Sequence, residues 1–149
     1  MTDYLLDTNI LLRASDRNSN QHSLANQAVY YLLNQGHQCL LTPQILIEFW
    51  VVCTRPVEAN GFGWTTKRSE TQINQFLSQF SLLSETSNTF SDWFQMVTKY
   101  EIKGKRTHDI KILAVMKSYG ISHILTFNPN DFIAVNEFTI VHPQAIINS

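Results

Sequence analysis

The chain has 149 residues, of which 44% are apolar and 15% are charged, and its formal net charge is −1 at pH 7. This length is close to the commonest size of a single hydrophobic core, so we expect one domain over residues 1–149. The composition is too apolar for a disordered chain, and no run approaches the roughly 20 apolar residues of a membrane-spanning helix. Two cysteines are too few for a disulfide framework or a zinc cluster. Because the start lacks a signal-peptide pattern, we expect a soluble, cytoplasmic protein.

Four short apolar runs are typical of buried strands, and they cover residues 4–6, 39–41, 124–126 and 139–141. Apolar residues at helical spacing predict helices within residues 24–33, 43–53, 73–80, 90–100 and 107–116. We expect Thr42 and Thr107 to cap the helices that follow them, and Gly36 and Gly120 to end helices. The proline and glycines of residues 54–69 predict a loop. Short strands alternating with amphipathic helices indicate an α/β domain with a parallel sheet covered on both faces.

Aromatic residues gather in two segments. Phe90, Trp93 and Phe94 recur at helical spacing, and we interpret this stripe as part of the core. The other segment, residues 60–64, lies in the predicted loop and is followed by two basic residues. We favour a loop that folds back to cap the core, although such a segment can also stack on unpaired bases or form a groove for a partner helix.

Four acidic residues stand where a carboxylate is unusual or chemically useful. Asp7 follows the first strand and Asp131 follows the strand at residues 124–126; in an open parallel sheet, the carboxyl ends of the strands face the functional crevice. Glu48 lies in an otherwise apolar helix, where an ionised carboxylate is costly unless it is paired or binds a cation. Asp109 lies in the first turn of a later helix.

Each of these acids, taken alone, also has a structural explanation. Asp7 and Asp131 can form polar turns, and Asp109 can stabilise its helix start by about 0.3–1 kcal/mol through the helix dipole. Taken together, carboxylates that share one crevice cannot all ionise without compensation, and no Lys or Arg adjoins Asp7, Glu48 or Asp131 in the sequence. A divalent cation would compensate, and oxygen ligands with few histidines favour Mg²⁺ or Mn²⁺ over zinc. Such a site suits hydrolysis of a phosphodiester bond.

These residues also carry a resemblance to a known family. Four short motifs resemble, in order and in their placement on the elements, the pattern of PIN-domain nucleases. They are residues 5–9 (Leu-Leu-Asp-Thr-Asn), Glu48, residues 107–109 (Thr-His-Asp), and residues 126–132. The resemblance runs from Leu5 to about Pro143, and within the family the chain is most similar to the VapC-type toxins of bacterial toxin–antitoxin pairs.

The resemblance implies a three-layer α/β/α domain with a central, mostly parallel sheet. It further implies an endoribonuclease that depends on Mg²⁺ or Mn²⁺ and acts on RNA. It also implies that the chain forms a homodimer and is inhibited by a co-encoded antitoxin protein whose tail covers the active site.

The resemblance also implies roles for particular residues. Asp7, Glu48 and Asp109 match the acidic metal-site positions, while Thr8, Asn9 and Thr126 match polar positions that support the acids. The fourth metal-site position is open between two residues. Asp131 supplies the charge there, or Asn128 only orients water.

A basic run lies directly before Asp109. Five of the eleven Lys and Arg residues fall between positions 99 and 111. We interpret four residues of this run as candidate RNA-binding residues: Lys103, Lys105, Arg106 and His108. The alternative for the whole run is a solvated helix end and loop, and for His108 it is a surface position in the first turn.

Three competing functions are weighed against this prediction. A haloacid-dehalogenase-like phosphatase also has an acid after its first strand, but it needs a second acid two residues later, where this chain has Asn9. A non-catalytic relative that only binds RNA or protein is disfavoured because the matching acids are all retained. A PIN-domain nuclease of RNA processing, without a toxin role, remains an alternative.

Overall fold

The computed structural model describes all 149 residues, and its centre is a five-stranded sheet. The strands run in the order β3-β2-β1-β4-β5, and every neighbouring pair is parallel. They are β1 (Asp3–Leu6), β2 (Gln38–Leu41), β3 (Ser81–Leu82), β4 (His123–Leu125) and β5 (Thr139–Val141). Leu5 is in register with Leu40 on one side and with Ile124 on the other, so the carboxyl ends of the three central strands lie side by side.

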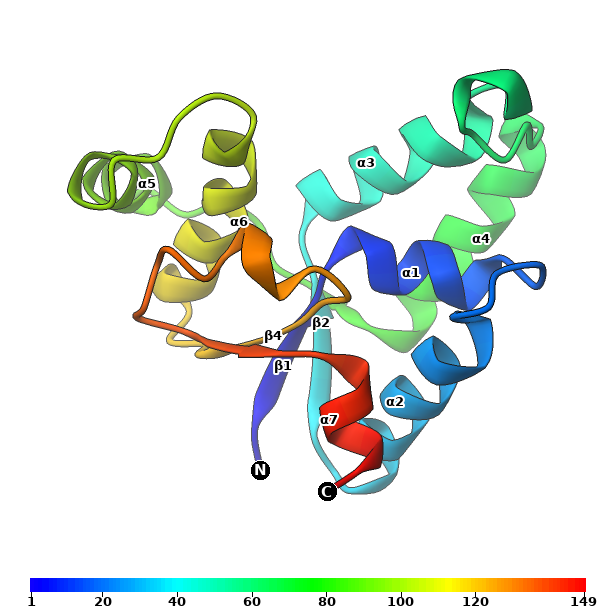
Figure 1. Cartoon of the computed structure of the whole chain (residues 1–149), viewed down its shortest axis with the longest axis horizontal. Coiled ribbons are helices and arrows are strands. Elements are labelled where there is room, and N and C mark those ends of the chain that lie inside the picture. The colour runs from blue at the N-terminus through cyan, green and yellow to red at the C-terminus, as the bar shows by residue number, and fades with distance from the viewer.

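Seven α-helices surround this sheet. They are α1 (Thr8–Ser15), α2 (His22–Asn34), α3 (Pro43–Thr54), α4 (Thr66–Gln79), α5 (Thr89–Lys99), α6 (Arg106–Ser118) and α7 (Pro143–Ile147). Figure 1 shows α5 and α6 on one side of the sheet and α1, α3 and α4 on the other, while α7 packs against α2. This is the three-layer α/β/α arrangement expected from the sequence. No helix has the length and apolar character needed to cross a membrane.

The apolar runs became strands because both faces of the sheet are covered. Leu5, Leu6, Ile124 and Leu125 are completely buried, as expected for parallel strands with helices on both faces. The predicted strands are confirmed to within about one residue at each end, and the strand expected at residues 124–126 stops at Leu125. The sheet thus brings Asp7 and Thr126, the residues that follow β1 and β4, to the same edge.

The two predicted threonine caps have different outcomes. The Thr42 hydroxyl accepts a hydrogen bond from the backbone N–H of Ile45 at 3.3 Å, which confirms it as the cap of α3. The prediction for Thr107 was wrong, because α6 begins at Arg106 and has no side-chain cap. Thr107 lies inside the first turn, where its hydroxyl donates instead to the carbonyl of Gly104 at 2.7 Å.

Several short elements were not predicted. The missing elements are α1, β3, α7, the 3-10 helices Val57–Ala59 and Pro129–Asp131, and the start of α4 inside the predicted loop. Both residues of β3 are exposed, so no apolar run marks this strand. Helices as short as α7, with five residues, contain too few turns for a periodicity to be recognised.

The two aromatic segments differ in burial and in how well the sequence predicted them. Phe62 and Trp64 pack against the core, which confirms that the loop folds back to cap it. The interpretation of the other stripe as core was wrong for two of its three rings, since Phe90 is 70% and Phe94 is 56% exposed. The reason is rotational: the buried side of α5 carries Met96, which is 1% exposed, so residues on the opposite side of the helix face solvent.

Candidate active site

Asp7 is a buried carboxylate held by several hydrogen bonds. It follows β1 directly and caps α1, where its Oδ1 accepts from the backbone N–H of Thr8 at 2.8 Å. Its Oδ2 accepts from the Thr126 hydroxyl at 2.8 Å and from Asn9 Nδ2 at 3.2 Å. Only 7% of Asp7 is exposed, so hydrogen bonds hold both carboxylate oxygens in a buried position.

The same bonds join the segments that follow β1 and β4. Asn9 Nδ2 also donates to Thr126 Oγ1 at 3.1 Å, and Asn9 Oδ1 accepts from the backbone N–H of Phe127 at 3.0 Å. Thr126 Oγ1 also accepts from the backbone N–H of Asn128 at 3.0 Å. Three of the polar residues expected near the acids, Thr8, Asn9 and Thr126, therefore bond directly to Asp7.

Glu48 lies in α3 and reaches the same end of the sheet. Its Oε2 accepts from the Thr8 hydroxyl at 2.8 Å, and its Oε1 accepts from Gln44 Nε2 at 3.0 Å. Gln44 Nε2 also donates to the backbone carbonyl of His108 at 2.8 Å. Thr8 thus links Asp7 to Glu48, and Gln44 links Glu48 to the start of α6. Sequence reasoning missed Gln44, although its position one helical turn before Glu48 is a usable signal.

Burial and two neighbouring acids raise the pKa of Asp7. Burial raises the pKa of Asp7 to about 6, against the effect of the hydrogen bonds from Thr126 and Thr8. The negative charges of Glu48 and Asp109 add to this increase. The charges of Glu48 in α3 and Asp109 in α6 therefore act on Asp7, the residue between β1 and α1.

Asp109 lies in the first turn of α6, as expected. Burial, followed by repulsion from Asp131 and Glu48, raises its pKa to about 6. The positive charges of Arg106 and His108 act in the opposite direction. Repulsion between carboxylates is thus only partly balanced by neighbouring cations.

Asp131 differs from the other acids because a cation faces it. No Lys or Arg adjoins Asp131 in the sequence, but the fold places Arg106 Nη2 3.8 Å from Asp131 Oδ1. Arg106 also donates through Nη1 to the carbonyl of Asn130 at 2.6 Å. This ion pair could not be predicted from the sequence, because Arg106 and Asp131 are distant in the chain. It forms because α6 packs beside the turn that contains Asp131. Asn128 is exposed, and only its backbone N–H is bonded within the network.

The arrangement fits a hard divalent cation in its donor chemistry. All four acidic groups offer oxygen atoms, and Asp7, Glu48 and Asp109 form no ion pair with Lys, Arg or His. Oxygen ligands of this kind suit Mg²⁺ or Mn²⁺. No three His, Cys, Asp or Glu side chains lie close enough together to hold a metal ion. Sharing one ion therefore requires these side chains to come closer than they are here.

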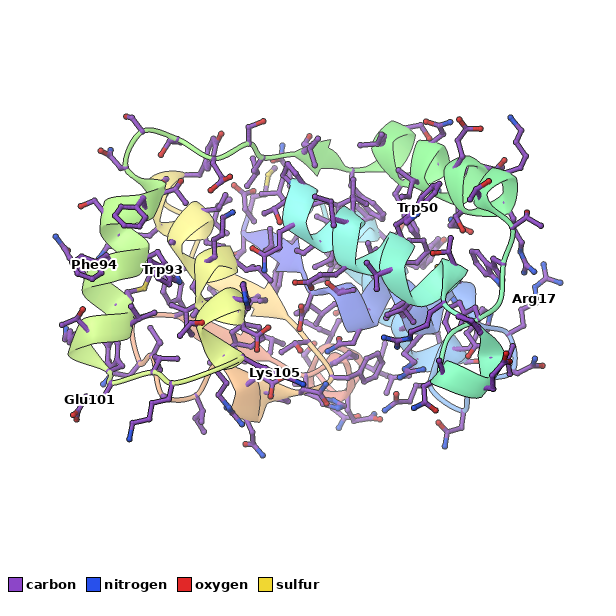
Figure 2. All side chains as sticks on the ribbon, turned by 90° about the horizontal axis from the view of Figure 1, so that it is seen from above. Arg17, Trp50, Trp93, Phe94, Glu101 and Lys105 are labelled. Atoms are coloured by element: carbon purple, nitrogen blue, oxygen red, sulfur yellow. The ribbon has the colours of Figure 1, made fainter.

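The surface beside the acids is hollowed and partly basic. A hollow of about 340 Å³ runs between α3 and α6, and its lining includes Gln44, Glu48, Glu85, His108 and Lys111. The four candidate RNA-binding residues, Lys103, Lys105, Arg106 and His108, are all exposed. Figure 2 shows Lys105 near the middle of the molecule by the start of α6, whereas Trp93 and Phe94 lie on α5 at one end.

Sequence comparison identifies the class of protein that this fold and site define. The PIN domain family model matches residues 4–137, and the chain therefore belongs to the PIN domain family. No curated protein matches the chain closely in sequence.

Solved structures of toxin–antitoxin proteins share this fold. A chain of VapBC2 from Rickettsia felis bound to a promoter DNA fragment has a TM-score of 0.72 and 16% identity, over 95% of this chain and 98% of that one. A toxin–antitoxin complex from Klebsiella pneumoniae has a TM-score of 0.65 and 23% identity, over 94% and 97% of the two chains. VapC20 of Mycobacterium tuberculosis, a toxin that cleaves the Sarcin-Ricin loop, has a TM-score of 0.65 and 13% identity, over 89% and 95%.

Proposed function

We propose that this protein is an endoribonuclease that requires Mg²⁺ or Mn²⁺ and hydrolyses phosphodiester bonds of RNA. The observation that carries the proposal is a chain of hydrogen bonds between distant segments: Thr8 bonds to both Asp7 and Glu48, and Gln44 bonds to Glu48 and to the backbone carbonyl of His108, the residue before Asp109. Membership of the PIN domain family supports the same chemistry.

Asp7, Glu48 and Asp109 would hold the ion, and Asp131 would help to recruit a second ion or to place water. A bound divalent ion would lower the pKa of water toward neutrality and draw charge from the scissile phosphate. The raised pKa of Asp7 and of Asp109 means that cation binding would favour the ionised form of each group. No histidine is required as a general base.

Neighbouring polar residues would keep the carboxylates in position. The Thr126 hydroxyl and the Asn9 amide donate to Asp7 Oδ2 and fix that carboxylate. Thr8 and Gln44 orient Glu48 by donating to one carboxylate oxygen each. Hydrogen bonds of this kind to the residues that bind a metal typically change affinity or activity by about 10–100-fold.

The substrate would be single-stranded or looped RNA, because the bases of an A-form duplex are shielded from side chains. Lys103, Lys105 and Arg106 would bind phosphates flanking the cleaved bond, and His108 would contact the strand close to Asp109. All four are exposed, so they are accessible to a polyanion.

We further propose that the protein is the toxin of a type II toxin–antitoxin pair, acting in the cytoplasm as a homodimer. The similar structures from Rickettsia felis and Klebsiella pneumoniae are those of VapBC2 and of a toxin–antitoxin complex, which supports a cognate antitoxin as partner. A small antitoxin reading frame adjacent to the gene would support this role over one in RNA processing.

Cleavage of a mixed panel of RNAs tests the enzymatic proposal. The wild type is compared with Asp7→Asn and Asp109→Asn, with and without Mg²⁺, and with Glu70→Gln, because Glu70 is an exposed acid on α4 that pairs with Lys67 and bonds to none of the site residues. We expect wild type and Glu70→Gln to cleave RNA only with the ion. The cleavage rate of each Asn variant should be at least about 100-fold lower, which corresponds to an activation free energy higher by roughly 3 kcal/mol. Equal products from all four proteins, or cleavage without a divalent ion, would contradict the proposal.

A further inference from the structure

Helix α5 presents aromatic rings to solvent beside the candidate active site. Phe90 is 70% exposed and Phe94 is 56% exposed. The ring of Phe90 is stacked on that of Phe94 at 6.0 Å with an interplanar angle of 9°, and it lies 5.7 Å from the ring of Trp93. Large apolar side chains gathered on a surface in this way are typical of binding sites.

Phe90 and Trp93 form the apolar part of a defined hollow. Its volume is about 410 Å³, and Thr107, His108 and Lys111 of α6 complete it from the other side. Trp93 is held in place because its indole N–H donates to the carbonyl of Thr107 at 2.6 Å. The hollow therefore has one fixed aromatic wall and one exposed ring at its mouth.

This aromatic hollow adjoins the hollow that contains Glu48. Glu85, His108 and Lys111 line both. A flexible ligand that places one group at the carboxylates can therefore place the next group against Phe90 and Trp93 without leaving the protein surface.

We propose that the aromatic hollow binds one unpaired base of the RNA strand, next to the phosphate held at the carboxylates. This inference rests on the proposed function. Stacking on aromatic rings is the main way in which proteins hold single-stranded bases. A Glu85–Lys111 ion pair of 3.1 Å spans the two hollows and offers a base edge one acceptor and one donor.

Charge favours a nucleic acid over an apolar peptide as the occupant. Three exposed cations, Lys103, Lys105 and Arg106, precede His108 and Lys111 along the same segment. A strand seated in the aromatic hollow would carry its phosphates toward these cations, whereas an apolar peptide segment would gain nothing from them.

Fluorescence of 2-aminopurine tests this inference, because the emission of this base is quenched when it stacks. A set of single-stranded RNA decamers carries one 2-aminopurine at successive positions, and Ca²⁺ replaces Mg²⁺ to keep a cation between the carboxylates and the phosphate while slowing cleavage. We compare the wild type with Phe90→Ala and with Tyr30→Ala, a matched control because Tyr30 is 69% exposed and does not line the hollow. Both aromatic residues are exposed, so both variants are expected to fold.

We expect strong quenching at one position of the strand with the wild type and with Tyr30→Ala. Phe90→Ala should lose this quenching and bind the RNA roughly 5- to 150-fold more weakly. Identical binding and quenching by the two variants would overturn the inference and leave the hollow to another occupant, such as a protein partner. Failure of the nuclease proposal is distinguishable, because it is measured as absence of cleavage by wild type in Mg²⁺.

Discussion

The candidate active site has two halves that are built differently. In the half at the strand ends, Asp7 is 7% exposed and Thr126 is completely buried, and short hydrogen bonds connect them. In the half at the start of α6, Arg106 and Asp131 have side chains that are 51% and 39% exposed, and their ion pair is 3.8 Å long. Both halves contribute carboxylates that repel one another.

The difference indicates which half is fixed by the fold. Buried hydrogen bonds hold one geometry, since breaking any of them leaves a desolvated group without a partner. Exposed ion pairs contribute about 0–1 kcal/mol and rearrange readily. We therefore expect the strand-end half to be preorganised and the α6 half to adapt when a cation or RNA binds.

The largest expected effect concerns the charge on Asp7. Its folded pKa of about 6 lies above the ordinary 3.8, so between about pH 4 and pH 6 the folded state keeps a proton that the unfolded state has released. Stability contributed by this group is therefore present at low pH and falls as pH rises to about 6, by roughly 3 kcal/mol. Above about pH 6, Asp7 is ionised in both states, so it no longer changes stability with pH.

Urea unfolding across this pH range, without divalent ions, measures the effect. Asp7→Asn keeps a helix-capping side chain but has no charge, so its free energy of unfolding should fall less than that of the wild type. Mg²⁺ should stabilise wild type at pH 7.5 more than at pH 5, and should stabilise Asp7→Asn less. If the free energy of unfolding changed with pH in the same way for both proteins, ionisation of Asp7 would not destabilise the folded state.

A smaller effect is expected from Thr126→Val, which keeps the shape of the side chain and removes its hydroxyl. Asp7 loses a donor, while Asn9 and the backbone N–H of Asn128 lose an acceptor. We expect stability to fall by about 1–3 kcal/mol and the Asp7 pKa to rise further, because this hydrogen bond lowers it.

Urea unfolding and the pH profile measure both consequences. Thr71→Val is the matched control, because the Thr71 hydroxyl is exposed and bonds only to the carbonyl of Lys67 in its own helix. If both valine variants were equally stable, the strand-end half would not be the rigid part of the site.

The smallest effect is expected from the exposed half. Lys103 and Lys105 are exposed and form no ion pair with an acidic group. Lys103→Glu with Lys105→Glu should leave stability within about 0.5 kcal/mol. RNA should bind about tenfold more weakly, and the slope of log affinity against log salt should flatten by about 1.4, or roughly 0.7 for each phosphate that the protein no longer neutralises.

Fluorescence anisotropy with a short RNA at several salt concentrations measures affinity and slope together. Lys67→Glu provides a control for added negative charge, since Lys67 lies on α4 and pairs with Glu70. Unchanged affinity in the double variant would show that the two lysines are solvated surface residues that do not bind RNA.

The sequence was sufficient for the features that depend on local pattern. The runs at β1, β2, β4 and β5 were recognisable because strands covered on both faces are continuously apolar. Thr42 with Pro43 marked the start of α3, because capping acts within one helical turn. Position at the end of a strand likewise identified Asp7 as a candidate site residue.

Interactions between distant segments could not be read in this way. The hydrogen bond from Gln44, which also holds Glu48, to the carbonyl of His108 spans 64 positions, and the pairing of Arg106 with Asp131 depends on how α6 lies beside the turn after β4. The exposure of Phe90 and Phe94 depended on the rotation of α5 about its axis, which packing against α6 fixes.

The sequence by itself determined the alternation of strands and helices and the types of residue that stand at the strand ends, because both follow from local periodicity and capping. Only the tertiary structure decided which carboxylates repel one another, which of them pairs with an arginine, and which aromatic rings are exposed to solvent. These outcomes depend on distances across the sheet and between helices, and such distances arise only when the whole core is packed.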